Sequence, residues 1–320
     1  MIDTPLLEVR HLKKYFDTPR GKLHAVDDLN FTIQKGQTLG MVGESGCGKS
    51  TAGRTVMMLH PPTAGEVLFE GENIVGAQGR ALKELRRKMQ IIFQDPFSSL
   101  NPRMTVFESI AHPLIINGIY KNNNQAEAET LRLMELVGLS RRLVNTYPHE
   151  LDGGRRQRIV IARALALKPS FIVCDEPVSA LDVSIQAQIL NLLQDLQEEM
   201  GLTYLFITHN LAVVKHFSND IAVMYLGQVV EKAPAEELFA RPLHPYTRAL
   251  ISAIPVADIH AKQERILLKG EITSPINPKP GCRFAKRCAY CTEACTARDP
   301  ELKEESPGHF IACARWQELW

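Results

Sequence analysis

The segment Gly43–Thr51, with the sequence GESGCGKST, has the residue types and the spacing of a phosphate-binding loop. Glycines let the backbone N–H groups of such a loop wrap around phosphate oxygens, and the N-terminus of the following helix adds positive potential. Lys49 can reach the β- and γ-phosphates of a nucleotide, and Ser50 can bind Mg²⁺. A chance glycine-rich turn is the alternative, although strand, loop, lysine and serine follow in the required order. The residues predicted to contact nucleotide here are Gly43, Glu44, Ser45, Gly46, Cys47, Gly48, Lys49, Ser50 and Thr51.

Two carboxylates follow the apolar run of FIVCDEP, which predicts a buried strand. A strand that ends in two carboxylates can hold Mg²⁺ and orient a water molecule beside a phosphate. We predict that Asp175 is a ligand of Mg²⁺ and that Glu176 is the general base that polarises the attacking water. Such a pair is a weak signal alone and becomes specific beside a phosphate-binding loop.

Two more polar side chains follow predicted strands. His209, in ITHN, could bond the γ-phosphate or hold the attacking water, although a lone histidine is more often structural. Gln94, in IIFQDPF, could touch Mg²⁺ or water through its amide, and this signal is weak by itself.

The stretch HELDGGRRQRIVIARAL places a glycine pair, Gly153 and Gly154, just before a predicted helix. Such a pair can bring backbone N–H groups onto an anion. Asp152 lies directly beside them, where an ionised carboxylate would repel a phosphate. The motif therefore predicts anion binding with one unfavourable charge.

The cysteines are concentrated in the last 39 residues, with the spacing C-x5-C-x2-C-x3-C-x17-C. In a reducing compartment this cluster favours a metal site over disulfides. Zinc and a [4Fe–4S] cluster both take four such ligands, and spacing alone does not choose between them. His309 could replace one thiol in a zinc site. The five clustered cysteines are Cys282, Cys288, Cys291, Cys295 and Cys313.

Strands must deliver these residues to one edge of a sheet, and the chain alternates strand and helix patterns accordingly. This alternation predicts an α/β fold with a mostly parallel sheet and flanking helices. Short strand pairs near the start predict an antiparallel β subdomain, and helical periodicity dominates about residues 95–167. We expect a nucleotide-binding domain over residues 1–250 and a Cys-rich extension over residues 251–320.

Composition narrows the possible functions. The chain has 37 Lys+Arg against 36 Asp+Glu, a net charge of +1, which does not suggest bulk nucleic-acid binding. No apolar run reaches the roughly 18 residues that a membrane span needs, and the start lacks a signal peptide. We therefore expect a cytosolic chain that reaches a membrane only through another protein.

The motifs in order resemble the ATP-binding-cassette ATPases over about residues 5–250. The resemblance implies ATP and Mg²⁺ as ligands and a head-to-tail pair of cassettes, in which each ATP lies between one phosphate loop and the partner's signature glycines. The matching elements are Phe16 (adenine-stacking aromatic), Gly43–Thr51, Gln94, Leu151–Arg158 (signature), Cys174–Glu176, Ser179–Asp182 and His209.

Later segments resemble the ATPase subunits of oligopeptide, dipeptide and nickel importers; they are DPFSSLNPR, EPVSALDVS, HPYTRALISAIP and the run up to GCRFAKRC. That group implies two permeases, an extracellular substrate-binding protein, a second ATPase and a place at the cytoplasmic face of the membrane. It also implies a [4Fe–4S] cluster, with zinc or free thiols as the alternatives. The implied cluster ligands are Cys282, Cys288, Cys295 and Cys313, which leaves Cys291 as an extra cysteine.

The signature departs from the family pattern, which normally has Ser at position 152. Asp152 accepts hydrogen bonds but cannot donate one to the γ-phosphate when it is ionised. We expect that this subunit contributes an impaired lid to one of two unlike ATP sites. Alternatively, Asp152 turns outward and a neighbouring donor replaces the missing hydroxyl.

Two other classes of protein remain in view. A soluble cassette acting on nucleic acid or ribosomes would share these motifs, but commonly fuses two cassettes or carries large insertions. A kinase of another fold is disfavoured, because it would not account for the motifs LDGGRRQR and SALD. The transported substrate cannot be inferred from this chain.

Overall fold

We describe a computed structural model that covers residues 4–255, 265–268, 270 and 274–319. It divides into two compact units, which we call the first unit, Met1–Gly76 with Phe206–Trp320, and the second unit, Ala77–Leu205. The predicted helical segment 95–167 falls inside the second unit. Residues 271–273, which belong to the run up to GCRFAKRC that supports the importer resemblance, lie outside the described residues.

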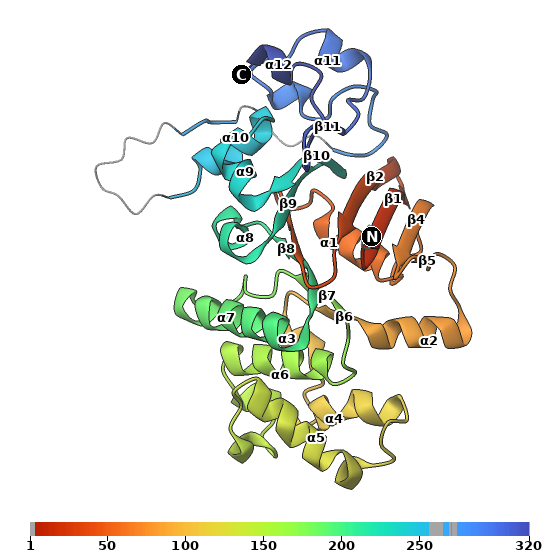
Figure 1. Cartoon of the computed structure of the whole chain (residues 1–320), viewed down its shortest axis with the longest axis vertical. Coiled ribbons are helices and arrows are strands. Elements are labelled where there is room, and N and C mark those ends of the chain that lie inside the picture. The colour runs from red at the N-terminus through yellow and green to blue at the C-terminus, as the bar shows by residue number, and fades with distance from the viewer. Residues whose placement is uncertain (1–3, 256–264, 269, 271–273, 320) are drawn as a thin grey trace. The chain divides into compact units, whose positions relative to one another are not determined.

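The first unit contains an antiparallel sheet in the order β2-β1-β4-β5 (Figure 1). In β1, apolar Leu7 and Val9 are buried, while Glu8 between them is half-buried and Arg10 is exposed, the alternation of a sheet with one covered face. A turn at Glu70-Gly71 joins β4 and β5. The bounds are β1 Leu7–Thr18, β2 Gly21–Ile33, β4 Ala64–Phe69 and β5 Glu72–Asn73.

A mixed sheet forms the rest of the first unit's core. The fully buried β3 (Thr38–Val42) pairs in parallel with β9 (Asp220–Tyr225), and β10 (Gln228–Pro234) pairs antiparallel with β9. β12 (His309–Ile311) then pairs antiparallel with β10, and β11 (Lys303–Ser306) with β12. Strands from the C-terminal extension thus join the same sheet as the strand that leads into the phosphate loop.

Short helices cover this unit. Near the C-terminus the extension contains η3, α11 and α12, which Figure 1 shows in blue. The bounds are α1 Lys49–Val56, α8 Leu211–Phe217, α9 Ala235–Ala240, α10 Pro245–Ser252, η3 Ala285–Arg287, α11 Ala294–Ala297 and α12 Trp316–Leu319.

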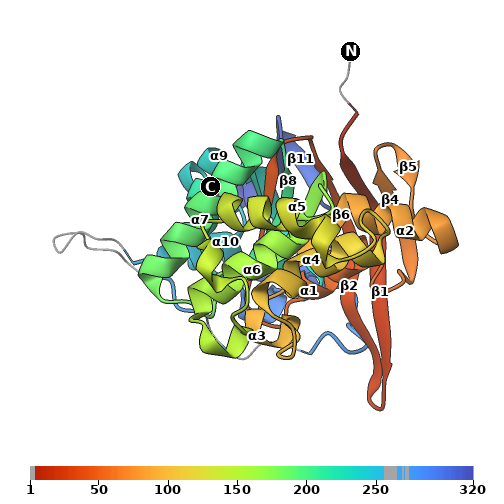
Figure 2. The same cartoon turned by 90° about the horizontal axis from the view of Figure 1, so that it is seen from below.

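The second unit is mainly helical, with β6 (Met89–Ile92) and β7 (Phe171–Asp175) paired in parallel. Figure 2 shows α4, α5 and α6 packed together. A capping box, Thr105 with Glu108, fixes the start of α4. The helices are α2 Gly79–Lys88, α3 Pro96–Ser99, α4 Val106–Ile116, α5 Asn123–Leu136, η1 Arg141–Leu143, η2 Pro148–Glu150, α6 Gly153–Leu165 and α7 Val183–Met200.

One strand, β8 (Thr203–Thr208), runs across the boundary between the units. Strands and helices therefore combine as the sequence predicts, which confirms the α/β class with flanking helices and a separate antiparallel sheet. Among the described residues, none of the helices combines the length and the apolar character of a membrane span.

Candidate nucleotide-binding site

The phosphate loop lies between β3 and α1 and requires glycine at two positions. Gly43 and Gly48 have φ angles of 154° and 107°, a conformation that side chains rarely adopt. A Cβ atom at Gly43 would lie 2.1 Å from the carbonyl oxygen of Met224, and one at Gly48 would lie 2.1 Å from that of Ala25. The loop backbone is therefore pressed against two neighbouring strands, and no larger residue fits without a shift.

Lys49 points its ammonium group into this loop. Its side chain is buried, and Nζ donates to the carbonyl oxygens of Gly43 at 2.8 Å and Glu44 at 3.0 Å. In the described structure no side chain caps the first turn of α1, which begins at Lys49. The loop thus offers a buried cation and a helix N-terminus, the elements that bind phosphate.

Phe16 and His209 also belong to the first unit. Phe16 lies on β1 and is half-buried, with the Lys14 ammonium 4.8 Å from its ring centre and the His60 ring edge-on at 5.7 Å. His209 is exposed and directly follows β8. Phe16 thus lies on a strand and His209 lies directly after one.

In the second unit the structure brings Gln94 and Glu176 together. The Gln94 amide donates to the Glu176 carboxylate at 3.1 Å. Asp175 is the buried last residue of β7, and Glu176 follows with φ 50°, a left-handed backbone that strains a residue with a side chain. Such strain of about 1 kcal/mol or more is typical of functional sites.

The signature segment shows a local role for its carboxylate. Asp152 is the N-cap of α6, where its side chain accepts the N–H of Arg155 at 2.7 Å and lies 3.5 Å from the Arg155 guanidinium. The two glycines allow the start of α6 to pack closely against residues 181 and 185. A Cβ atom at Gly154 would lie 2.8 Å from the Ile185 side chain, and one at Gly153 would lie 3.0 Å from that of Leu181. Asp152 therefore stabilises the helix start, and its exposed carboxylate has a basic neighbour.

The prediction of a [4Fe–4S] cluster, with zinc as its alternative, is wrong. Within the described residues, no group of three or more His, Cys, Asp or Glu side chains is arranged to hold a metal ion. Burial raises the pKa of the Cys282 thiol to about 12, because an apolar environment disfavours the thiolate. The other predicted cluster ligands, Cys288, Cys295 and Cys313, are likewise free thiols, as is the extra Cys291.

His309, the alternative zinc ligand, has a different partner. Its side chain is fully buried, and Nε2 lies 2.8 Å from the Glu231 carboxylate on β10. The imidazole therefore connects β12 to β10, and its partner is a carboxylate rather than a metal ion.

Sequence reasoning missed three residues that contact the phosphate loop. The Tyr246 hydroxyl accepts the N–H of Glu44 at 2.9 Å, and Arg287 pairs with the Glu44 carboxylate at 2.6 Å. Gly227 donates its N–H to the Cys47 carbonyl oxygen at 2.7 Å. Tyr246 lies in HPYTRALISAIP and Arg287 in GCRFAKRC, two stretches singled out only for their resemblance.

Comparison with known proteins agrees with this geometry. Residues 26–179 match the ABC transporter family, and residues 230–295 match the oligopeptide/dipeptide transporter C-terminal region. A putative peptide import ATP-binding protein of Brucella ovis is 51% identical over 315 residues, covering 98% of this chain and 99% of that protein. The oligopeptide transport ATP-binding protein OppF of Bacillus subtilis is 52% identical, covering 96% of each chain.

Solved structures resemble the fold as well. The ATP-binding cassette MJ0796, in a dimeric post-hydrolysis state bound to ADP and Pi, is 30% identical with a TM-score of 0.65. The match covers 72% of this chain and 98% of that one.

A phosphate loop on a mixed sheet, a carboxylate pair at a strand end and a glycine signature define an ATP-binding-cassette ATPase. The chain belongs to this family, within the group of ATP-binding transport proteins that has the oligopeptide/dipeptide transporter C-terminal region.

Proposed function

We propose that this ATPase drives a membrane importer for peptides or related small solutes, at the cytoplasmic face of the membrane. The observation that supports this most is the near full-length similarity to proteins named for peptide import, at about half of all positions. The C-terminal region shared with oligopeptide and dipeptide transporters supports the same substrate class.

We assign each predicted side chain one task. Phe16 stacks on the adenine, the N–H groups of Gly43–Thr51 bind the phosphates, and Lys49 binds the β- and γ-phosphates. A loop that requires glycine at positions 43 and 48, around a buried ammonium, fits a triphosphate. When bound, Mg²⁺ would neutralise developing phosphate charge. Ser50, Gln94 and Asp175 are its proposed ligands.

We assign the role of general base in ATP hydrolysis to Glu176, whose carboxylate is bound by Gln94. Glu176 accepts the proton of the attacking water, and His209 holds the γ-phosphate or that water in place. The amide of Gln94 donates to Glu176 and so orients the carboxylate.

The proposed assembly contains a second, non-identical ATPase and two permeases, with an extracellular binding protein that delivers the solute. In this arrangement Asp152, Gly153 and Gly154 cover the ATP bound to the other ATPase. The carboxylate of Asp152 makes this lid weaker than a serine would, because it cannot donate to the γ-phosphate.

The transport proposal is tested by reconstituting the chain with its neighbouring-gene permeases and ATPase in liposomes. ATP enclosed on the cassette side should drive uptake of a labelled peptide. Lys49→Ala should abolish uptake, and the exposed Lys22→Ala should not. Uptake that persists at the wild-type rate with Lys49→Ala would contradict the proposal.

The unequal sites are tested in the same assembly with the variant Asp152→Ser. Serine keeps the helix cap, so the stability of the chain should stay the same. Phosphate release should rise several-fold if the carboxylate impairs the lid. An unchanged rate would show that the carboxylate has no effect on hydrolysis.

A further inference from the structure

The C-terminal extension touches the phosphate loop through an arginine. The Arg287 guanidinium binds both carboxylate oxygens of Glu44, at 2.6 and 3.0 Å. Its side chain is 8% exposed and that of Glu44 is 26% exposed. Two parallel, largely shielded contacts form the strongest kind of arginine–carboxylate pair, so this contact fixes the Glu44 side chain in one direction.

Aromatic rings fix Arg287 in turn. Its guanidinium lies 5.9 Å from the centre of the Tyr225 ring, and that ring packs edge-on against Phe284 at 5.3 Å. Phe284 also contacts Tyr246 at 5.4 Å, and all three rings are buried. The hydrogen bond to Glu44 raises the pKa of Arg287, which keeps the guanidinium charged.

Glu44 is held at its backbone as well as at its side chain. Its N–H donates to the Tyr246 hydroxyl at 2.9 Å, and its carbonyl oxygen accepts from Lys49 at 3.0 Å. The second residue of the phosphate loop is therefore fixed by α10, by η3 and by the phosphate-binding lysine itself.

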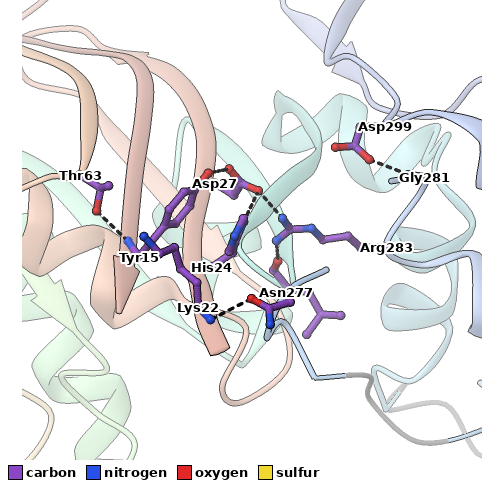
Figure 3. A network of polar contacts seen from close by, with 10 residues as sticks. Tyr15, Lys22, His24, Asp27, Thr63, Asn277, Gly281, Arg283 and Asp299 are labelled. Atoms are coloured by element: carbon purple, nitrogen blue, oxygen red, sulfur yellow. Dashed lines mark hydrogen bonds and ion pairs between the residues drawn. The ribbon is translucent and has the colours of Figure 1, made fainter. Parts of the chain in front are cut away.

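Arg283, four residues before Arg287, makes a second connection (Figure 3). Its guanidinium contacts the Asp27 carboxylate and the Leu226 carbonyl oxygen. The adjacent Gly227 donates its N–H to Cys47 in the phosphate loop at 2.7 Å and accepts the N–H of Asp27 at 2.8 Å. Arg287 thus reaches the loop directly, and Arg283 reaches it through the 226–227 turn.

An unpaired Glu44 would act against nucleotide. Its carboxylate would bring negative charge to a loop that must bind a triphosphate, and it could compete with phosphate for the Lys49 ammonium. Arg287 neutralises this charge and holds the carboxylate in one position.

We propose that Arg287 is a positioning residue for nucleotide binding, through which the C-terminal extension sets the affinity of the phosphate loop for MgATP. This goes beyond the transport proposal, because it concerns ATP binding by the chain alone.

The experiment measures the Kd of a fluorescent ATP analogue with Mg²⁺ on the full chain and its variants. Arg287→Gln should bind about five- to tenfold more weakly, since a partly shielded charge is uncovered beside the phosphates. Glu44→Gln is the reference for the double variant, which should bind as Glu44→Gln does and more tightly than Arg287→Gln, because no charge is left to neutralise. Arg315→Gln removes an exposed ion pair with Glu318 in the same extension and should leave the Kd unchanged.

Recovery in the double variant separates positioning from mere loss of structure, which would leave the double variant as weak as Arg287→Gln. That result, or wild-type affinity in Arg287→Gln, would overturn the proposal. If Arg287→Gln does not fold, Arg287→Lys replaces it. A lysine cannot bind both carboxylate oxygens, so its Kd should lie above wild type, and an equal Kd would again overturn the proposal. These affinities are measured on the chain alone. They would be the same if the chain did not drive peptide transport, so the two proposals can fail separately.

Discussion

At the scale of single residues, the side chains proposed for chemistry are held by short-range contacts. Glu176 has a strained backbone with φ 50° and a carboxylate bound by Gln94 at 3.1 Å. Asp152 caps α6 and so has a structural task besides any effect on nucleotide. A substitution at either position must keep the local contact if its chemical effect is to be measured alone.

Glu176→Gln meets this condition, because glutamine has the same size and its carbonyl oxygen still accepts from Gln94. We expect ATP binding to be retained and hydrolysis to fall by about 100-fold or more, the usual loss when a general base is removed. Single-turnover phosphate release checks the rate, and titration with an ATP analogue checks binding. Hydrolysis within about threefold of wild type would exclude Glu176 as the base.

At the scale of elements, α10 has a histidine as its N-cap. His244 Nδ1 accepts the N–H of Tyr246 at 3.1 Å, and the imidazole is fully buried. Burial lowers its pKa from 6.5 to about 4, and the nearby Glu231 opposes this only in part. The neutral imidazole of His244 therefore caps the start of α10. This helix also presents the Tyr246 hydroxyl to the phosphate loop.

This lowered pKa predicts acid sensitivity. Between pH 6.5 and 4 the unfolded chain takes up a proton at His244 and the folded chain does not, so stability falls as the pH drops and levels off near pH 4. The loss from this group is about 3 kcal/mol. Urea unfolding at pH 7 and pH 4.5 should show a smaller loss for His244→Asn, which keeps a capping acceptor. The exposed His216→Gln should behave as wild type, and an identical loss in His244→Asn would contradict the assignment.

At the scale of the whole molecule, the C-terminal extension is part of the sheet in the first unit. β12 pairs with β10, and the fully buried pair of His309 and Glu231 lies between these strands. Glu231 also accepts the N–H groups of Leu243 and His244, at 2.7 and 2.9 Å. One carboxylate thus joins the extension, β10 and the start of α10.

Removing His309 should deprive this buried carboxylate of its side-chain partner, while the N–H groups of Leu243 and His244 remain bound to it. We expect His309→Ala to cost about 3 kcal/mol of unfolding free energy, as for other broken buried pairs. The double variant Glu231→Gln, His309→Gln should lose less, because the buried charge is gone. Denaturant unfolding measures both, with the exposed Arg10→Ala as a control whose midpoint should not move. A loss in the double variant equal to that in His309→Ala would refute the explanation.

The sequence by itself determined the parts of this protein whose chemistry is local. A phosphate loop, a strand ending in two carboxylates and a glycine signature each work through neighbouring residues, so their spacing is enough to recognise them. The strand and helix periodicities likewise predicted the α/β class and the antiparallel sheet, since each element buries one face.

Only the tertiary structure decided which distant residues meet. Arg287 and Glu44 are 243 positions apart, and His309 and Glu231 are 78 apart, so no spacing pattern links them. The cysteines led to the wrong expectation because close spacing along the chain does not by itself arrange the side chains that a metal ion needs, and no such group occurs among the described residues. Such contacts arise when burial of apolar surface brings segments together, and each polar group then binds the partner that this burial places beside it.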